Sequence, residues 1–304
     1  MNKQKLIIIV GPTAVGKTAL SVEVAKKFNG EIISADSAQV YQGLNIGSAK
    51  VTKEEAQGIK HHLLDVVPFN GVFTTGDWVK MAKDAINEIC AKGKTPVIVG
   101  GTGLYVNSLL FDIGVSCGRD EEYRNKLYEI YNQENGKEIA YNMLKEVDPE
   151  SAKKIHPNQK DRVIRALEIF HITGKKKSEM KNSTESNYDY ILFGLTDDRD
   201  KLYERINYRT DKMLESGLIE EVQSLMNKGL TKENQSMQSI GYKEVYSYLT
   251  NEYDKETFIE KLKQNTRNYA KRQFTYFKKL PNIIWKNYKD KEEIFNLIKE
   301  FINE

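Results

Sequence analysis

Apolar and polar positions alternate in short blocks over the first hundred residues. Three apolar runs have strand length, and each ends in a polar or glycine-rich turn: residues 5–10, 31–34 and 95–99. After the first run, Leu20, Val24 and Phe28 recur every fourth residue, which predicts a helix. Strands that alternate with helices in this way are typical of a parallel sheet with right-handed crossovers.

The pattern changes in the middle of the chain. Long polar side chains dominate and β-branched runs are few, as in residues 120–127, which predicts helices. A second helix is predicted over residues 160–170, and a polar, mobile loop over 174–187. The apolar run at 190–195 then predicts another strand of the sheet. We therefore predict a core made of residues 1–115 and 187–304, interrupted by a mainly helical insertion, residues 116–186.

Basic residues gather in two places. Residues 151–186 hold nine Lys or Arg against four Asp or Glu, and residues 261–289 hold nine against none. On a helix through the second stretch, Arg267, Lys271 and Lys278 would share one face. A solvated helix face normally mixes charge signs, so we favour a surface for nucleic-acid phosphates, with Tyr276, Trp285 and Tyr288 near it. The alternative is an amphipathic helix with a solvated basic face.

One motif carries most of the chemistry. The loop after the first strand matches G-x-x-x-x-G-K-[ST] at every fixed position, with a strand before it and a helix after it, as Gly11, Pro12, Thr13, Ala14, Val15, Gly16, Lys17 and Thr18. The glycines let consecutive N–H groups point into one concavity, Lys17 reaches terminal phosphate oxygens, and Thr18 can bind Mg²⁺. The fold class is therefore α/β, with a P-loop NTPase-like parallel sheet flanked by helices and a helical insertion domain. Such a loop binds a phosphorylated ligand, for which ATP or another nucleotide is the usual choice.

Two further turns should meet the P-loop, because ligands bind beyond the carboxyl ends of parallel strands. Asp36 lies at the end of the second strand. It is either a general base or magnesium partner, or an ordinary turn residue. Residues 100–103 contain three glycines, which permit close approach of a ligand or simply form a turn. The strand at 95–99 ends in Gly100 and not in the metal-binding Asp typical of ATP hydrolysis. His61 and His62 are adjacent, so their side chains diverge and we interpret them as structural or substrate-contacting.

Composition narrows the class of protein. The chain has 304 residues, of which 39% are hydrophobic and 29% charged, with a net charge of +3. The apolar runs are too short to cross a membrane, and Met1 leads directly into the first strand without a secretion signal. Cys90 and Cys117 have no metal-binding spacing and are interpreted as reduced thiols. We expect a cytoplasmic monomer.

The ordered set of motifs closely resembles the tRNA dimethylallyltransferases, also called tRNA isopentenyltransferases. The resemblance covers nearly the whole chain. Besides the P-loop, it rests on Ile33–Tyr41, His61–Asp65, Val99–Tyr105, Asp161–Glu168, Arg205–Leu214, Ile240–Glu244 and Arg267–Phe277. The family's commonest pattern is not followed at residues 47–51, 68–78 and 112–120.

The resemblance implies a reaction. A dimethylallyl group would pass from dimethylallyl diphosphate to N6 of the adenosine at tRNA position 37. By resemblance, Lys17, Mg²⁺ on Thr18 and Arg209 neutralise the diphosphate, with Arg205 as a helper. Asp36 takes the family's role of the base for the adenine amine, and Thr102 that of a second catalytic position.

The resemblance also implies a tRNA surface. The anticodon stem-loop would contact both the core and the insertion. The implied contacts are Asp36, Ser37, Ala38, Gln39, Thr102, Arg124, Gln159, Lys160, Asp161, Arg162, Val163, Arg165, Arg267, Lys271 and Lys278.

Other functions compete with this one. An adenylate isopentenyltransferase would prenylate a free nucleotide and would not need two basic regions. A small-molecule kinase would use ATP on the P-loop. A non-enzymatic RNA-binding protein with a regulatory nucleotide site would bind tRNA without turnover.

Overall fold

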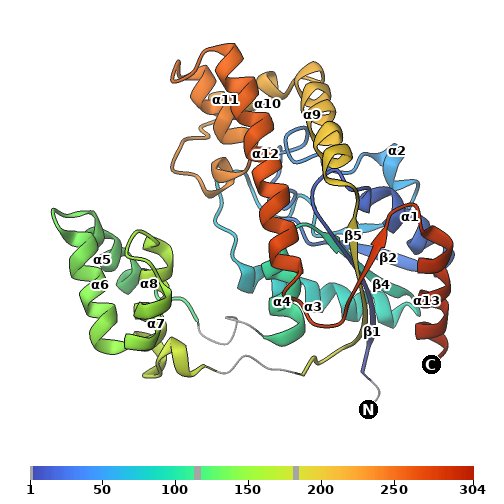
Figure 1. The fold of residues 1–304 in the computed structure, drawn as a ribbon, viewed down its shortest axis with the longest axis horizontal. Coiled ribbons are helices and arrows are strands. Elements are labelled where there is room, and N and C mark those ends of the chain that lie inside the picture. Colours follow the sequence, from blue (N-terminus) through green and yellow to red (C-terminus); the bar gives the residue numbers. More distant parts are fainter. Residues whose placement is uncertain (1–2, 113–117, 181–184) are drawn as a thin grey trace. The chain divides into compact units, whose positions relative to one another are not determined.

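Six parallel strands form the sheet at the centre of the α/β part of the chain (Figure 1). The structure is a computed structural model, and it describes residues 3–112, 118–180 and 185–304. The strand order is β3-β2-β4-β1-β5-β6. The strands are β1 (Lys5–Val10), β2 (Gly30–Ser34), β3 (His61–His62), β4 (Thr95–Gly100), β5 (Asp189–Thr196) and β6 (Ile283–Asn287).

The central strands are buried on both faces. Residues 6–10 of β1 are all 0% exposed, and Ile9 pairs with Val99 on one side and Phe193 on the other. Continuous apolar runs are what a strand covered on both faces requires. The four strands predicted from those runs are confirmed, and so is the predicted fold class. The sequence analysis did not predict β3 and β6, which lie at the two edges of the sheet.

Helices cover the sheet. One buried cluster joins α1, α9 and α13 to side chains of β1, β4 and β5, while α3 packs against β2 and β4. Leu20 and Val24 of α1 belong to this cluster, and Phe28, the C-cap of the helix, packs at its edge. The helices of this part are α1 (Lys17–Lys27), α2 (Lys53–Ala56), α3 (Thr75–Ala91), α4 (Gly103–Phe111), α9 (Arg199–Glu215), α10 (Leu218–Asn227), α11 (Tyr242–Leu249), α12 (Lys255–Phe277) and α13 (Lys291–Asn303).

The predicted basic helix over residues 261–289 is wrong in extent. The helix is α12, which begins at Lys255 and ends at Phe277, and the last part of the stretch is strand β6. Pro281 cannot donate the backbone hydrogen bond that a helix needs, and Asn282 adopts a left-handed φ of 56°. The chain therefore turns here and adds a strand beside β5.

Residues 111–185 form a second unit with its own core. Its helices are α5 (Glu121–Asn132), α6 (Gly136–Val147), α7 (Pro149–Lys154) and α8 (Lys160–Thr173). Leu127, Leu144, Val163 and Leu167 meet at the centre of this bundle. Cys117 and part of the predicted 174–187 loop lie outside the described residues. Within the described residues, no helix is long and apolar enough to span a membrane.

Candidate active site

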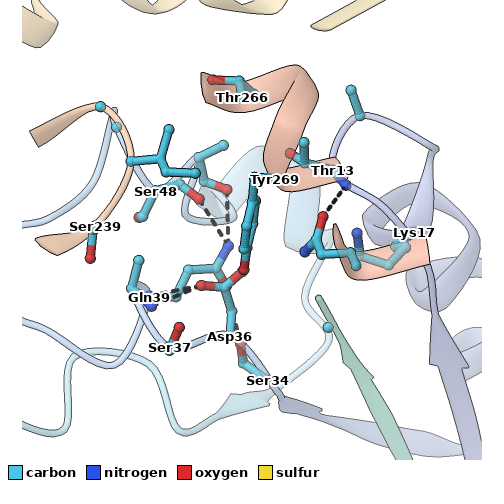
Figure 2. A pocket seen from close by; sticks show the side chains of 18 of the residues that line it. Thr13, Lys17, Ser34, Asp36, Ser37, Gln39, Ser48, Ser239, Thr266 and Tyr269 are labelled. Atoms are coloured by element: carbon cyan, nitrogen blue, oxygen red, sulfur yellow. Dashed lines mark hydrogen bonds between the residues drawn. The ribbon is translucent and has the colours of Figure 1, made fainter. Parts of the chain in front are cut away.

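A cavity of about 440 Å³ lies where the P-loop and the turns after β2 and β4 meet. Figure 2 shows Thr13, Lys17, Asp36 and Tyr269 around it, contributed by the P-loop, the β2 turn and α12. The predicted meeting of three turns is therefore observed. The residues predicted for this site that line the cavity are Thr13, Ala14, Lys17, Thr18, Asp36, Ser37, Ala38, Gln39 and Arg209.

The P-loop holds its lysine inward. Gly16 has φ +100°, and a Cβ there would lie 3.2 Å from the ring of Tyr288, so glycine fits both the turn and the contact. The Lys17 Nζ donates to the carbonyls of Gly11 at 3.0 Å and Pro12 at 2.8 Å. Burial lowers the pKa of Lys17 to about 8, with Asp36 opposing the shift and Arg209 adding to it. Lys17 is therefore charged at neutral pH, but it loses its proton at a lower pH than an ordinary lysine.

Asp36 has two distinct oxygens. Its Oδ1 accepts from the backbone N–H groups of Ala38 at 2.9 Å and Gln39 at 3.4 Å, which is the ordinary turn role. No described residue donates to Oδ2. The carboxylate also raises the pKa values of Lys17 and Arg209 against the lowering effect of burial. One oxygen therefore shapes the turn, and the other is available to a ligand.

The glycine-rich turn after β4 is bonded to the Asp36 turn. The Thr102 N–H donates to the Ala35 carbonyl at 3.0 Å, and the Thr102 Oγ1 accepts from the Ser37 N–H at 3.0 Å. A Cβ at Gly100 would lie 2.0 Å from the Ala35 carbonyl oxygen, so the two turns touch through backbone. Thr102 thus holds the residue next to Asp36.

Gln39 is occupied within the same region. Its Oε1 accepts from Ser34 Oγ at 3.0 Å, and its Nε2 donates to the carbonyls of Ser48 and Ala49 at 3.3 and 3.2 Å (Figure 2). The side chain therefore braces the 45–50 loop. Its proposed contact with RNA would need these bonds to be shared or exchanged.

Two arginines of α9 point to different places. Arg209 lines the cavity, and burial lowers its pKa while Asp36 opposes that shift. Arg205, one turn earlier, is ion-paired with Asp197, and its guanidinium lies 5.1 Å from the Tyr288 ring centroid. Arg205 is not among the residues that line the cavity. Arg209 alone of the two is placed to meet a bound anion.

The sequence analysis missed the contribution of α12 to the cavity. Thr266, Tyr269, Arg272 and Gln273 line it. Burial raises the pKa of Tyr269 and the charge of Asp36 raises it further, so this phenol stays protonated. A signal was present, because Thr266, Tyr269 and Gln273 are spaced to share one helix face.

Comparisons with known proteins identify the family of this chain. The family model described as IPP transferase matches residues 39–280. The tRNA dimethylallyltransferase of Bacillus pumilus is 48% identical over 286 residues, which are 93% of this chain and 90% of that protein. The chain belongs to the IPP transferase family.

Solved structures of the family have the same fold. The full-length tRNA isopentenylpyrophosphate transferase of Bacillus halodurans matches with a TM-score of 0.75 and 44% identity, over 99% of this chain and 97% of that one. A eukaryotic dimethylallyltransferase acting on tRNA matches with a TM-score of 0.82 and 34% identity, over 94% of this chain and 74% of that one. The likeness of this IPP transferase to them therefore includes both the sheet and the insertion.

Two arginines of the insertion form ion pairs inside it. The carboxylate of Glu168, which is 0% exposed, accepts from Arg124 Nη1 at 3.1 Å and from Arg165 Nη1 at 2.6 Å. The Val163 side chain is also fully buried, in the core of the bundle. These three implied RNA contacts thus have structural roles in this conformation.

The start of α8 is more open. Arg162 and Gln159 are exposed, and Asp161 accepts from the Tyr128 hydroxyl at 2.8 Å. Lys160 Nζ lies 4.7 Å from the Tyr128 ring centroid and donates to Asn132 at 2.8 Å. This end of the helix presents polar groups that a ligand can reach.

On α12 and at its C-cap, Lys278, the basic residues differ in their partners. Arg267 donates to Asn207 on α9 at 2.7 Å and to Gln264 at 2.8 Å. Lys271 and Lys278 are exposed, with Lys278 4.5 Å from the Phe274 ring centroid. Among the described residues neither lysine has an ion pair with an acidic side chain. Their charges therefore face solvent.

The three aromatic residues near this basic stretch are partly buried, and each packs against a neighbouring part of the core. Each lies against a glycine, where an added Cβ would be 2.3 Å from Tyr276 (at Gly103), 2.8 Å from Trp285 (at Gly194) and 3.2 Å from Tyr288 (at Gly16). The absent side chains make room for these rings. The proximity of aromatic and basic residues in the sequence therefore reflects the fold.

The histidine pair separates as expected. His62 is buried and bonded to Glu31 at 2.7 Å, while His61 lines the cavity, and burial lowers its pKa. Glu31, His62 and Glu88 form the one grouping in the described chain that brings three residues of metal-ligating type together. Their two carboxylates already pair with three ammonium groups, those of Lys60, Lys92 and Lys94, so both acids have cationic partners without a metal.

Proposed function

We propose that this IPP transferase moves a dimethylallyl group from dimethylallyl diphosphate to N6 of the adenosine at position 37 of tRNA and releases diphosphate. The observation that carries the proposal is that Lys17, Arg209 and Asp36 border one cavity. Two cations suit a diphosphate, and a carboxylate suits an amine that must lose a proton. Relatives of this chain are named tRNA dimethylallyltransferases.

The diphosphate is the leaving group. The bond between the allylic carbon and the diphosphate oxygen breaks, and its electron pair goes to the oxygen. Lys17, Arg209 and the N–H groups at the start of α1 stabilise the negative charge that develops there. Because the cation left on carbon is delocalised over the allyl system, stabilising the leaving group is the main requirement.

The residues fit a magnesium ion. Thr18 borders the cavity beside Lys17, and Mg²⁺ commonly binds through one or two protein oxygens together with substrate phosphates. Thr18 would hold the ion, which would supply further neutralisation of the diphosphate charge. The other groups that act in the reaction are side chains and backbone N–H groups of the protein.

Asp36 is the proposed base. The adenine amine is a weak nucleophile because its lone pair is delocalised into the ring. As the new bond between N6 and carbon forms, an N6 proton passes to Oδ2 of Asp36, the oxygen that the turn does not use. Thr102 keeps Asp36 in place by bonding the N–H of Ser37.

The RNA must present an extruded base, since an adenine stacked in the anticodon loop cannot enter the cavity. We propose that the turn at Asp36, Ser37, Ala38 and Gln39 contacts the anticodon loop. Phosphates of the stem-loop would meet the exposed basic residues of α12 and the start of α8. The enzyme would work as a monomer in the cytoplasm.

One incubation tests the proposal against its rivals. The purified chain is given dimethylallyl diphosphate and Mg²⁺ with either unmodified tRNA or AMP, and nucleosides are analysed by mass spectrometry. Prenylated adenosine only from tRNA is the expected result. Product only from AMP would favour an adenylate isopentenyltransferase, and phosphate transfer from labelled ATP would favour a kinase. Binding of tRNA without any product would leave a non-enzymatic RNA-binding role.

A further inference from the structure

A single buried side-chain amide on α12 joins the P-loop (residues 11–18, called the diphosphate loop below) to the glycine-rich turn after β4. The Gln273 side chain is on α12, and the residue is 5% exposed. Its Oε1 accepts from the Thr13 N–H at 2.9 Å, drawn as the dashed line at Thr13 in Figure 2, and its Nε2 donates to the Gly101 carbonyl at 3.0 Å. These bonds span 260 and 172 residues of sequence.

Only an amide can make this pair of bonds with one side chain of this length. The Thr13 N–H can only donate and the Gly101 carbonyl can only accept, so the orientation of the amide is forced. A carboxylate would lose the bond to Gly101, and an ammonium would lose the bond to Thr13. Asparagine is shorter by one methylene group and would not reach both from the same helix position.

The glycine at position 101 is matched to this amide. A Cβ at Gly101 would lie 2.1 Å from Gln273 Nε2, which is far inside contact distance. The φ of Gly101 is outside the left-handed region, so its backbone tolerates alanine. Substituting Gly101 would therefore displace the tip of Gln273 without straining the main chain.

We infer that Gln273 is a positioning residue for the diphosphate loop. It sets the Thr13 end of the loop relative to the turn that carries Thr102, and thereby the distance between the diphosphate and the reacting amine. Because Gln273 lies two residues from the exposed Lys271, the same helix would carry both this bond and a phosphate contact of the RNA. The catalytic part of this inference rests on the proposed function, whereas the part that concerns diphosphate affinity does not.

The first test uses inorganic diphosphate with Mg²⁺, titrated calorimetrically into the full chain. Gln273→Ala should weaken its affinity by about 10-fold or more, because loss of the bond lets the loop shift away from its binding geometry. Gly101→Ala should weaken it by a similar factor. Gln223→Ala is the matched control, since that glutamine is exposed on α10 and bonds only Asn227 of its own helix. It should leave the affinity unchanged.

The double variant Gly101→Ala/Gln273→Ala makes the test specific. Without the amide there is nothing for the new Cβ to displace, so the double variant should bind diphosphate no more weakly than Gln273→Ala. Multiplication of the two single effects would overturn the inference. So would unchanged affinity in a folded Gln273→Ala protein, with folding checked by circular dichroism.

Kinetics separates this role from general stability. In both single variants the KM for dimethylallyl diphosphate should rise by about 10-fold, while the KM for tRNA stays within about 2-fold of wild type. An unchanged KM for dimethylallyl diphosphate in both single variants would contradict the inference, whatever the change in kcat. If wild type transfers no prenyl group at all, the proposed function fails, and the calorimetric comparison still decides the role of Gln273.

Discussion

The cavity and the insertion use charged side chains in opposite ways. Around the cavity, the charge of Asp36 raises the pKa values of Lys17 and Arg209 against the effect of burial, but each of the three side chains lines the cavity. In the insertion, Arg124 and Arg165 converge on the buried carboxylate of Glu168. The first arrangement leaves charge available to a ligand, and the second uses it to hold helices together. A count of basic residues does not distinguish the two, because what decides is whether an acid lies within reach.

Removal of Glu168 should have the largest effect on stability. Glu168→Ala leaves the two guanidinium groups without their common partner, and we expect the insertion to lose about 3–5 kcal/mol of unfolding free energy. Urea denaturation followed by circular dichroism measures it. Glu122→Ala is the control, because that residue pairs with Lys126 in solvent and should cost less than about 1 kcal/mol. Equal losses in the two variants would mean that Glu168 does not organise the insertion.

Asp36 should matter for turnover and little for RNA binding. Asp36→Ala should lower turnover by ~10²-fold or more, the usual scale for a lost acid or base. Asp36→Asn is the sharper variant, because its carbonyl oxygen can still accept from Ala38 and Gln39. Single-turnover assays and filter binding of tRNA measure the two properties. Near-normal turnover of Asp36→Asn would rule out the proposed base.

Lys17 should make diphosphate binding depend on pH. Its pKa in the folded protein is lowered to about 8, so the ammonium is present below that pH and is lost as the pH rises through it. Affinity for magnesium diphosphate should fall by up to about 10-fold per pH unit above 8. Lys17→Arg keeps its charge throughout this range and should not show that fall. Identical pH profiles for the two proteins would exclude Lys17 as the titrating group.

The exposed lysines on α12 and at its C-cap should account for part of the salt dependence of RNA binding. Lys271→Ala together with Lys278→Ala should lower tRNA affinity and reduce the slope of log K against log salt by about 2. Lys299→Ala, exposed on α13, should leave the slope unchanged. An unaltered slope in the double variant would remove the phosphate contacts from this helix.

Two arginines of α8 offer the closest comparison. Arg162 is exposed, whereas Arg165 pairs with Glu168. Arg162→Ala should reduce the salt slope by about 1 with little change in stability. Arg165→Ala should instead lower the unfolding free energy and change the slope less. Reversed results would show that Arg165 leaves Glu168 to bind RNA.

Much of the fold could be predicted from local patterns. The apolar runs identified β1, β2, β4 and β5, because strands buried on both faces must be apolar throughout. The edge strands were missed for the same reason. His61 and His62 are polar, and residues 283–287 are only partly buried, so neither segment carries the signal of a central strand.

The candidate site also has parts that the sequence predicts and parts that it does not. The P-loop and the Asp36 turn are contiguous segments, so their residues and spacing determine their own geometry. Arg209 and not Arg205 lines the cavity, because Arg205 instead contacts Asp197 and Tyr288. Sequence spacing does not reveal these contacts. The same holds for Gln273, whose partners lie on two distant loops.

The sequence by itself determined the P-loop motif, the parallel sheet behind it and the family. Tertiary structure decided which charges stay available, since Glu168 pairs with two arginines of the insertion while Lys271 and Lys278 remain exposed. It also decided that the aromatic residues at 276, 285 and 288 pack on glycines. The physical reason is that hydrogen bonds and ion pairs act over a few ångströms, whereas the partners that make them here are separated by tens to hundreds of residues and meet only when the chain folds.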